Sequence, residues 1–539
     1  MALKGAAAAA AIGFGGLALA AVLAGGESRA QGPSLGPSVG PSSAQTQAPW
    51  PPAATVPTLR TDQTELLERT LAGADSHGFE PGEFTPARLD EMLRSGDPAT
   101  RQFGQVQLID AVLRYARAVH TGRLPQAAFL EDWGLRPAAY DPAPGLAQAV
   151  AGDRLQAWLD ALPPPYTGYD SLRLGLSTYR AIAARGGWTS ISAGPALKLG
   201  DAGPRVLELR ARLAAEDPTT PLTSTPAPAP AQAAAVETPD PASLPASAAP
   251  AAPVTDGSVF DAPLQAAVMR AQKRFGLKDD GVVDRLTLTA LNVSVDRRID
   301  QITANMERWR WLPQVLPVDR IQVNVAAAIL TVFHADSPTL SMRAVTGRPG
   351  DETPMLQSQV QSIVLNPPWN VPSTIATKEL WPKERANPGY FAAHDFEVVT
   401  TPEGGTRLVQ KAGDQAALGK IKFDFPNPYG VYLHDTPTRS AFDRYGRLAS
   451  HGCVRLQKPL VLAKAVMQGD AVWTPEVLDA TIASGKTVRA SLPQPIAVFL
   501  FYWTAYVTPD GQVNFRDDPY GWDQELVDRI HTTEAARRA

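Results

Sequence analysis

One short segment of the chain holds the side chains best suited to covalent chemistry. It contains Cys453, the only cysteine among 539 residues, with His451 two positions and His434 nineteen positions before it. A lone cysteine is a buried apolar residue, an intermolecular link or a reactive thiol. Its neighbours Ser450 and Arg455 are polar or basic, and such surroundings favour the thiolate. We therefore predict that Cys453 is a nucleophile.

Two short strands are predicted in this segment. Alternation along the first strand puts Tyr432 and His434 on one face, and alternation along the second puts His451, Cys453 and Arg455 on one face. If the two strands pair, an imidazole lies beside the thiol.

A Cys–His couple of this kind performs acyl transfer at an amide or an ester. It supplies a thiolate nucleophile and a general acid for the leaving amine, and the N–H groups near Gly452 and Cys453 are placed to hold the oxyanion. Two histidines remain candidates for the base. His451 is nearer along the chain, whereas His434 comes from a separate strand and can face the thiol without local distortion.

Zinc binding is the alternative use of histidines in such a segment. A zinc peptidase needs three ligands and a catalytic carboxylate. The sequence contains neither an H-E-x-x-H motif nor an H-x-H pair. We predict no metal and no other cofactor.

The charge balance and the N-terminus limit the partners and the compartment. A net charge of −4 without a long basic run argues against a nucleic-acid partner. The chain begins with Lys4, an apolar run at 5–24 and small residues around Ala30, which is the pattern of an export signal. Because that run is close to the length that spans a bilayer, it could also stay as an uncleaved membrane anchor. Either way, the body of the protein is expected outside the cytoplasm.

Changes in periodicity predict a multidomain α+β chain. Helical patterns dominate the first half, and short β-type runs follow Pro317. Residues 374–420 interrupt the β pattern, and we predict that they form a lid over the motif, the alternative being a surface insertion. The apolar run at 497–507 is too short to span a membrane as a helix, and we predict a buried strand and hairpin of the same domain. The predicted boundaries are 1–30 for a signal peptide or anchor, 31–60 for a disordered linker, 61–195 for an all-α scaffold, 196–292 for a three-helix module with a disordered insert at 217–257, 293–318 for a connecting helix, 319–510 for a mostly β catalytic domain and 511–539 for a C-terminal hairpin and tail.

The motifs H-D-T-P at His434 and S-H-G-C-V-R at Ser450 resemble those of the L,D-transpeptidases with a YkuD-type catalytic domain. The long architecture is similar to their YcbB-like branch, from about residue 60 to the C-terminus. Further matching stretches are MERWRWLP at Met306, NPPWNVPSTIA at Asn366 and YWTAYVTPDGQVNFRDD at Tyr502. The split module at 196–292 resembles the peptidoglycan-binding three-helix domain.

The resemblance implies a periplasmic enzyme that crosslinks peptidoglycan. Cys453 would attack the third residue of a tetrapeptide donor stem, at the L-centre of diaminopimelate, and expel the terminal D-alanine. The thioester would then pass to the side-chain amine of a diaminopimelate on an acceptor stem, which gives a 3→3 crosslink. Inner-membrane association and wall-synthesis protein partners are compatible with this reading, and acylation by carbapenems is expected.

The resemblance also implies roles for individual residues. His434 would be the base, and Arg455 would fix the loop or meet a substrate carboxylate. Support of the oxyanion pocket would fall to Ser450, His451 and Gly452. The expected substrate-binding residues of the donor cleft are Trp369, Asn370, Tyr429 and Tyr432.

Two other functions remain open at this point. One is a hydrolase of the same fold, an L,D-carboxypeptidase or endopeptidase that gives the thioester to water. The other is a wall-binding scaffold without catalysis. The insert at 217–257 also leaves open whether the split module binds glycan, and the acceptor could be another stem, a lipoprotein or a free D-amino acid.

Overall fold

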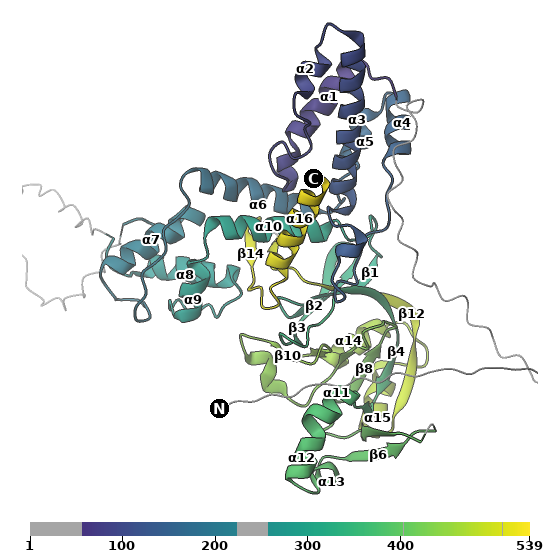
Figure 1. Cartoon of the computed structure of the whole chain (residues 1–539). Helices are drawn as coiled ribbons and strands as arrows, with labels where there is room; N and C mark the ends of the chain where they lie inside the picture. Colours follow the sequence, from purple (N-terminus) through teal and green to yellow (C-terminus); the bar gives the residue numbers. More distant parts are fainter. Residues whose placement is uncertain (1–56, 224–256, 403, 509, 539) are drawn as a thin grey trace, which may run out of the picture. The chain divides into compact units, whose positions relative to one another are not determined.

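The computed structural model describes residues 57–223, 257–402, 404–508 and 510–538. The predicted signal or anchor at 1–30, most of the linker at 31–60 and most of the insert at 217–257 lie outside the described residues. The described chain contains helical regions and a nine-stranded sheet, which confirms the predicted multidomain α+β fold (Figure 1). None of the helices in these described ranges has the length and apolar character needed to cross a membrane.

The first helical region has its own hydrophobic core. Its longest helix, α3, begins where the Asp97 side chain accepts a hydrogen bond from the Thr100 N–H, so the helix has the N-cap that its free N–H groups need. Leu108, Val112 and Val119 lie on its buried face. The helices of this region are α1 (Thr61–Ala72), α2 (Leu89–Leu93), α3 (Pro98–Thr121), α4 (Ala143–Ala151) and α5 (Leu155–Asp160).

A second core joins the three-helix module to neighbouring elements. Asp261 caps one module helix by accepting from the Leu264 N–H, and another helix begins directly after Asp284. An antiparallel bridge between Leu197 and Val283 links the two halves of the module. The elements of this core are α6 (Thr167–Ala184), α7 (Pro204–Glu216), α8 (Ala262–Arg274), α9 (Arg285–Leu291), α10 (Val295–Trp309), β13 (Ala505–Val507) and β14 (Val513–Phe515).

Two parts of this second core lie in ranges predicted for other domains. Helix α6 falls in the range predicted as scaffold, and Tyr169 and Leu176 on its buried face pack in the second core, where α6 lies against α10. The hairpin β13–β14 was predicted to belong to the catalytic domain. Its buried residues Ala505, Val513 and Phe515 also lie in the second core, because the chain leaves the catalytic sheet after β12.

The catalytic domain is built on the nine-stranded sheet. Its order is β10-β3-β11-β9-β8-β4-β12-β1-β2, and an additional pairing between β2 and β3 closes this order on itself, as in a barrel. The strands are β1 (Asp319–Asn324), β2 (Ile329–His334), β3 (Ser337–Gly347), β4 (Leu356–Leu365), β8 (Ile421–Asp424), β9 (Leu433–His434), β10 (Leu448–Ser450), β11 (Val454–Leu456) and β12 (Val488–Phe501). The helices that accompany them are α14 (Pro459–Val466), α15 (Pro475–Ala483) and α16 (Trp522–Arg538).

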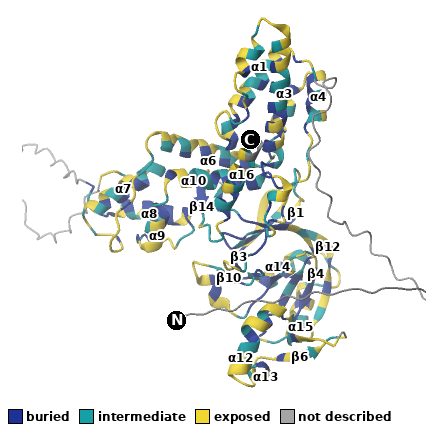
Figure 2. Ribbon diagram, in the orientation of Figure 1, coloured by how far each residue is buried: buried dark blue, intermediate teal, exposed yellow. Residues whose placement is uncertain are grey.

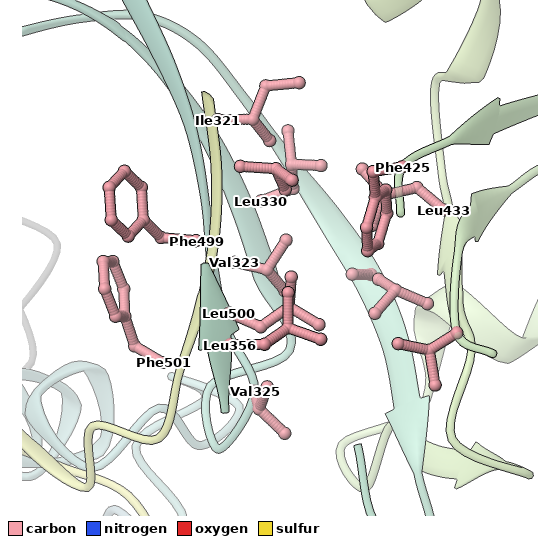
Figure 3. Close-up of a cluster of buried hydrophobic side chains, with 14 of the residues drawn as sticks. Ile321, Val323, Val325, Leu330, Leu356, Phe425, Leu433, Phe499, Leu500 and Phe501 are labelled. Carbon is pink, nitrogen blue, oxygen red and sulfur yellow. The ribbon is translucent and has the colours of Figure 1, made fainter. Parts of the chain in front are cut away.

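Alternation along the strands fills the interior of this sheet. Val323 of β1 and Leu500 of β12 point toward Leu433 of β9 and toward Phe425, which follows β8 (Figure 3). Phe499, the neighbour of Leu500 in β12, points to the other face of the sheet. Leu433, at the centre of the chemical motif, is fully buried. The strand that carries the predicted base is therefore fixed by the main core of the domain.

Residues 374–420, which the sequence predicts to form a lid, belong to a small folded unit with a hydrophobic core of its own. A three-stranded sheet in the order β5-β7-β6 pairs Trp369 with Gln410, so the inserted structure begins a few residues before 374. None of the residues of α12 is buried, and Figure 2 shows that helix in the exposed and intermediate colours. The elements are β5 (Trp369–Asn370), α11 (Ser373–Ile375), the π-helical turn η4 (Ala376–Leu380), α12 (Trp381–Ala386), α13 (Tyr390–Ala393), β6 (Phe396–Thr400) and β7 (Thr406–Gln410).

Candidate active site

The two predicted strands of the motif lie side by side. Strands β9 and β11 pair in parallel, with Val454 opposite Leu433 and Arg455 opposite His434. Leu433 and Val454 are fully buried in the core. Because side chains alternate along a strand, His434 and Arg455 lie on the other face of this pair. The ring of Tyr432 lies on the same face, at 5.5 Å between centroids from the His434 ring.

His434 is buried and neutral. Its Nδ1 lies 2.5 Å from the backbone carbonyl oxygen of Asp435, and because a carbonyl only accepts, Nδ1 carries the hydrogen. Nε2 therefore keeps its lone pair. Burial, together with the positive charges of Arg455 and Lys422, lowers the pKa of His434 to about 3. At neutral pH the ring is in the form that can take up a proton.

The Cys453 thiol is in contact with Tyr432. Burial raises the pKa of Cys453, while hydrogen bonding from Tyr432 and the charges of Lys422 and Arg455 act in the opposite direction. The expectation that polar and basic neighbours favour the thiolate is therefore wrong for the resting site, because the loss of hydration on burial outweighs them. At neutral pH Cys453 is therefore a thiol, which would have to lose its proton before or during any attack.

A chain of donors leads to the sulfur. The Tyr432 hydroxyl interacts with the Cys453 sulfur, and the Trp369 indole interacts with that hydroxyl. Since an indole N–H only donates, the Tyr432 oxygen accepts from Trp369 and its own hydrogen is free to point at sulfur. Burial raises the pKa of Tyr432, so its hydroxyl stays protonated. Of the expected substrate-binding residues, Tyr432 thus contacts Cys453 directly, and Trp369 contacts Tyr432.

The turn before Cys453 depends on glycine. Gly452 has φ of +99°, and a Cβ at this position would lie 3.2 Å from the Glu352 carbonyl oxygen. The Ser450 hydroxyl donates to the Cys453 carbonyl at 2.5 Å, and the Thr353 hydroxyl donates to the Gly452 carbonyl at 2.7 Å. Both carbonyls are thereby held by side-chain hydroxyls.

This turn also corrects the expected position of His451. Strand β11 begins only at Val454, so the alternation that would place His451 on the face of Cys453 does not extend back through Gly452. His451 instead reaches the lid, where its Nε2 lies 2.6 Å from the Glu379 carboxylate. Of the two histidines, His434 is the one whose free nitrogen belongs to the strand pair.

Two basic side chains flank the strand pair. Arg455 is half-buried, and no described carboxylate forms an ion pair with it. Lys422 lies opposite His434 across β8 and β9, with its Nζ 4.1 Å from the Tyr432 ring centre and 2.7 Å from Asp424. Sequence reasoning missed Lys422. Lys422 lies between the buried residues Ile421 and Phe423, and this alternation indicated that its side chain is on the face away from the core. Only the pairing of β8 with β9 shows that this face is the one that carries His434.

The remaining expected cleft residues are placed differently. Asn370 is exposed on β5, where it pairs with Val409 of the lid sheet. The Tyr429 hydroxyl donates to the Glu131 carbonyl at 2.8 Å, in the segment that follows the first helical region. Tyr429 therefore has a contact with the segment after the first helical region, and its role in a donor cleft stays a prediction.

Sequence reasoning also missed the support behind the turn. The Tyr520 hydroxyl donates to the Gly347 carbonyl at 2.6 Å and accepts from the Thr353 N–H at 3.2 Å. Thr353 in turn holds Gly452. These residues belong to no short motif and lie far apart along the chain, so the sequence did not indicate that they contact one another. A separate cavity of about 380 Å³, lined in part by Trp309, Gln322 and Trp503, lies away from this cluster and contains none of its residues.

The comparisons with known proteins agree with this geometry. Residues 318–474, which include Trp369, Tyr432, His434 and Cys453, match the family described as "L,D-transpeptidase catalytic domain". Residues 54–176 match "Scaffold domain" and residues 250–291 match "Putative peptidoglycan binding domain". The chain therefore carries an L,D-transpeptidase catalytic domain together with these two accessory domains, which confirms the resemblance noted from the motifs.

Individual relatives are similar over parts of the chain. A Haemophilus influenzae protein named "Putative L,D-transpeptidase" is 32% identical over 243 residues, which cover 42% of this chain and 48% of that protein, so the chain spans about half the length of this curated relative. An L,D-transpeptidase structure from Stackebrandtia nassauensis is 14% identical with a TM-score of 0.21, over 58% of this chain and 96% of that one. The catalytic domain from the E. faecium L,D-transpeptidase acylated by ertapenem is 13% identical with a TM-score of 0.17, over 35% of this chain and 99% of that one.

Proposed function

We propose that this protein is a cysteine L,D-transpeptidase that forms 3→3 crosslinks in peptidoglycan. The observation that carries the proposal is the parallel pairing of β9, which holds His434, with β11, which begins directly after Cys453, inside the matched domain. Alternation along these strands supports a neutral His434 and the Cys453 thiol sharing one face. The export pattern at the N-terminus supports a periplasmic location, with an uncleaved anchor as a route to inner-membrane association. The match at 250–291 supports peptidoglycan as the partner.

The first half-reaction forms a thioester and releases D-alanine. As the Cys453 sulfur attacks the carbonyl carbon of the third stem residue, at the L-centre of diaminopimelate, His434 Nε2 accepts the thiol proton. The new oxyanion faces the N–H groups of Gly452 and Cys453, neither of which donates a hydrogen bond to another described residue. The C–N bond to D-alanine then breaks, and the His434 imidazolium gives its proton to the leaving amine.

The second half-reaction transfers the acyl group. The side-chain amine of diaminopimelate on the acceptor stem attacks the thioester carbonyl, and His434 takes the proton that this amine loses. The C–S bond breaks, and the departing thiolate recovers the proton from His434. Because the pKa of His434 is depressed, its imidazolium is a strong acid in both steps and does not persist.

Three further side chains have roles in this scheme. The Tyr432 hydroxyl donates to the sulfur while it carries negative charge, and Trp369 orients that hydroxyl. Arg455 holds a half-buried positive charge beside Cys453 without an ion-pair partner among the described residues, which suits it to bind a carboxylate of the donor stem. Ser450 and His451 shape the turn that presents the two N–H groups.

Carbapenem acylation belongs to the same proposal. The E. faecium catalytic domain is described as acylated by ertapenem. The carbonyl of a β-lactam would react with the same nucleophile, base and oxyanion donors as the stem peptide. We therefore expect a stable thioester at Cys453.

The product mixture from purified disaccharide-tetrapeptide tests the proposal. The full-length chain is incubated with this substrate and the products are separated by mass spectrometry, with Cys453→Ala as the control. Dimers crosslinked 3→3 with one D-alanine released per crosslink are expected from the wild type alone. Tripeptide without dimers would instead establish a hydrolase, and no product from folded wild type would favour a wall-binding scaffold.

A further inference from the structure

The lid touches the nucleophile turn through one carboxylate. Glu379 lies in η4, the π-helical turn of the lid, and its carboxylate oxygen is 2.6 Å from His451 Nε2. The same carboxylate is 3.3 Å from the Arg348 guanidinium. Since a carboxylate only accepts, Nε2 of His451 carries the hydrogen that it donates. Single turns of π-helix recur at functional positions, because they re-aim a side chain without ending the helix.

Arg348 ties this contact to the same turn from a second direction. Arg348 lies between β3 and β4, where its backbone N–H donates to the Ser450 carbonyl at 3.0 Å and its guanidinium binds Asp351 at 2.6 Å. Hydrogen bonding from His451, and then from Arg348, lowers the pKa of Glu379. Three segments distant in sequence therefore meet at one carboxylate.

The rest of the lid is joined to the sheet at its two ends. The Asn366 N–H donates to the Lys420 carbonyl at 2.8 Å, and the Lys420 N–H donates to the Asp435 carboxylate at 2.8 Å. These bonds fix where the lid leaves and rejoins the sheet. Glu379 is a contact between the lid interior and the turn that carries Cys453, and with a side chain 34% exposed it can be released to water.

We propose that Glu379 is a positioning residue that couples seating of the lid to alignment of the oxyanion donors. Resting on the proposed transpeptidase function, the inference is that the Glu379–His451 bond fixes the His451 backbone and, one and two residues on, the N–H groups of Gly452 and Cys453. Oxyanion donors act only when they point at the position where charge develops. Acylation is therefore fast when the lid is seated and slow when η4 is released.

Two substitutions at Glu379 separate geometry from simple loss of a side chain. Glu379→Ala removes both hydrogen bonds, and we expect the rate constant for acylation of Cys453 by ertapenem to fall about tenfold, the effect of one charge-assisted hydrogen bond of roughly 1.4 kcal/mol. Glu379→Gln keeps an oxygen that accepts from His451 Nε2, so it should recover part of that loss. In Glu379→Ala, amide exchange should accelerate in η4 and at residues 450–453.

A second lid glutamate provides the matched control. Glu397 pairs with Lys411 within the lid and is more exposed to solvent than Glu379, at 53% against 34% of its side chain. Glu397→Gln should leave both the acylation rate and the exchange at 450–453 as in the wild type. All variants are compared as the full chain after circular dichroism has shown that they fold. If Glu379→Ala does not fold, Glu379→Gln is used for the test in its place.

The outcomes distinguish this inference from the function on which it rests. If wild type is acylated and Glu379→Ala behaves as Glu397→Gln does in both rate and exchange, the positioning role is wrong and the transpeptidase proposal stands. If folded wild type is not acylated at all, the proposed function fails. Amide exchange at 450–453 would then still decide whether Glu379 holds the turn.

Discussion

The lid and the sheet beneath it are held together by different forces. The interior of the sheet is a large cluster in which many residues, including Ile321, Phe423 and Leu433, are fully buried. The lid core is a small cluster whose larger members, such as Phe391 and Phe396, remain 8% and 9% exposed. Regions with few buried apolar contacts open locally at lower free energy than large cores do. We therefore expect the unit at 374–420 to open locally at a lower free energy than the sheet.

The reactive groups follow this division. His434 and Cys453 lie on or beside strands whose neighbouring residues are fully buried, so their positions follow the sheet. The lid region contributes Trp369 and Glu379, which act on Tyr432 and His451. In the proposed mechanism, the groups that transfer protons lie on the sheet, and the turn before Cys453 is aligned by the lid.

The largest expected effect tests whether the base belongs to the sheet. His434→Gln removes the free Nε2 lone pair, and crosslinking by the full-length chain should fall by about 10²–10⁴-fold, the usual contribution of a general base. His451→Gln should lower the crosslinking rate much less, because His451 affects the reaction only by positioning the turn before Cys453. A greater loss in His451→Gln than in His434→Gln, measured as initial rates of dimer formation, would reverse the assignment.

The next effect measures the rigidity of the sheet. Phe423→Ala removes a fully buried ring from the main core, and we expect about 3–5 kcal/mol of destabilisation. Amide exchange should increase throughout β4, β8 and β9, which pair with one another. An increase confined to β8 would show that the sheet does not open as one unit.

The matching substitution in the lid should act locally. Phe391→Ala removes a ring that contacts Trp381 and Phe396, and we expect about 2–4 kcal/mol of loss within the lid core. Exchange should accelerate in α12, α13 and β6 while β8 and β9 keep their protection. If the sheet amides lose protection to the same degree, the lid and sheet form one cooperative unit and the comparison above is wrong.

The smallest effect comes from pH. His434 has a pKa of about 3 in the folded protein and about 6.5 in an unfolded chain. The unfolded chain thus binds a proton that the folded one does not, and the stabilisation present above pH 6.5 is lost as the pH falls toward 3. Between pH 7.5 and pH 5 the sheet should lose about 2 kcal/mol.

Exchange at β8 and β9, corrected for the intrinsic pH dependence, measures this loss. His434→Gln is the control, because it has no proton to bind and should abolish the local pH dependence. A local reading is needed because burial also lowers the pKa of His77, in the first helical region, to about 2. Equal pH dependence at β9 in wild type and His434→Gln would exclude His434 as its cause.

The sequence predicted the parts of the site that depend on local pattern. Alternation and the two motifs predicted that the strand of His434 pairs with the strand next to Cys453. The change in periodicity predicted that residues 374–420 leave the β pattern, and the structure has a separate small sheet there, whose role as a lid stays a prediction. The errors all arise from tertiary structure. The raised pKa of Cys453 depends on burial by distant strands, and the position of His451 depends on the φ of +99° at Gly452.

Other residues were out of reach for the same reason. Lys422 enters the site only because β8 pairs with β9, and Glu379 only because a π-helical turn faces the motif. The packing of α6 against α10 likewise depends on the shapes of both helices. The apolar pattern of α6 alone does not identify the helix against which it packs. Pairing between distant segments is the information that a single sequence lacks.

The most direct test of the central claim is the intact mass of the full-length chain after exposure to ertapenem, in wild type and in Cys453→Ala. A single adduct on the wild type that is absent from Cys453→Ala would establish Cys453 as the acylated nucleophile of the strand pair. An adduct that persists in Cys453→Ala, or no adduct on folded wild type, would contradict the account.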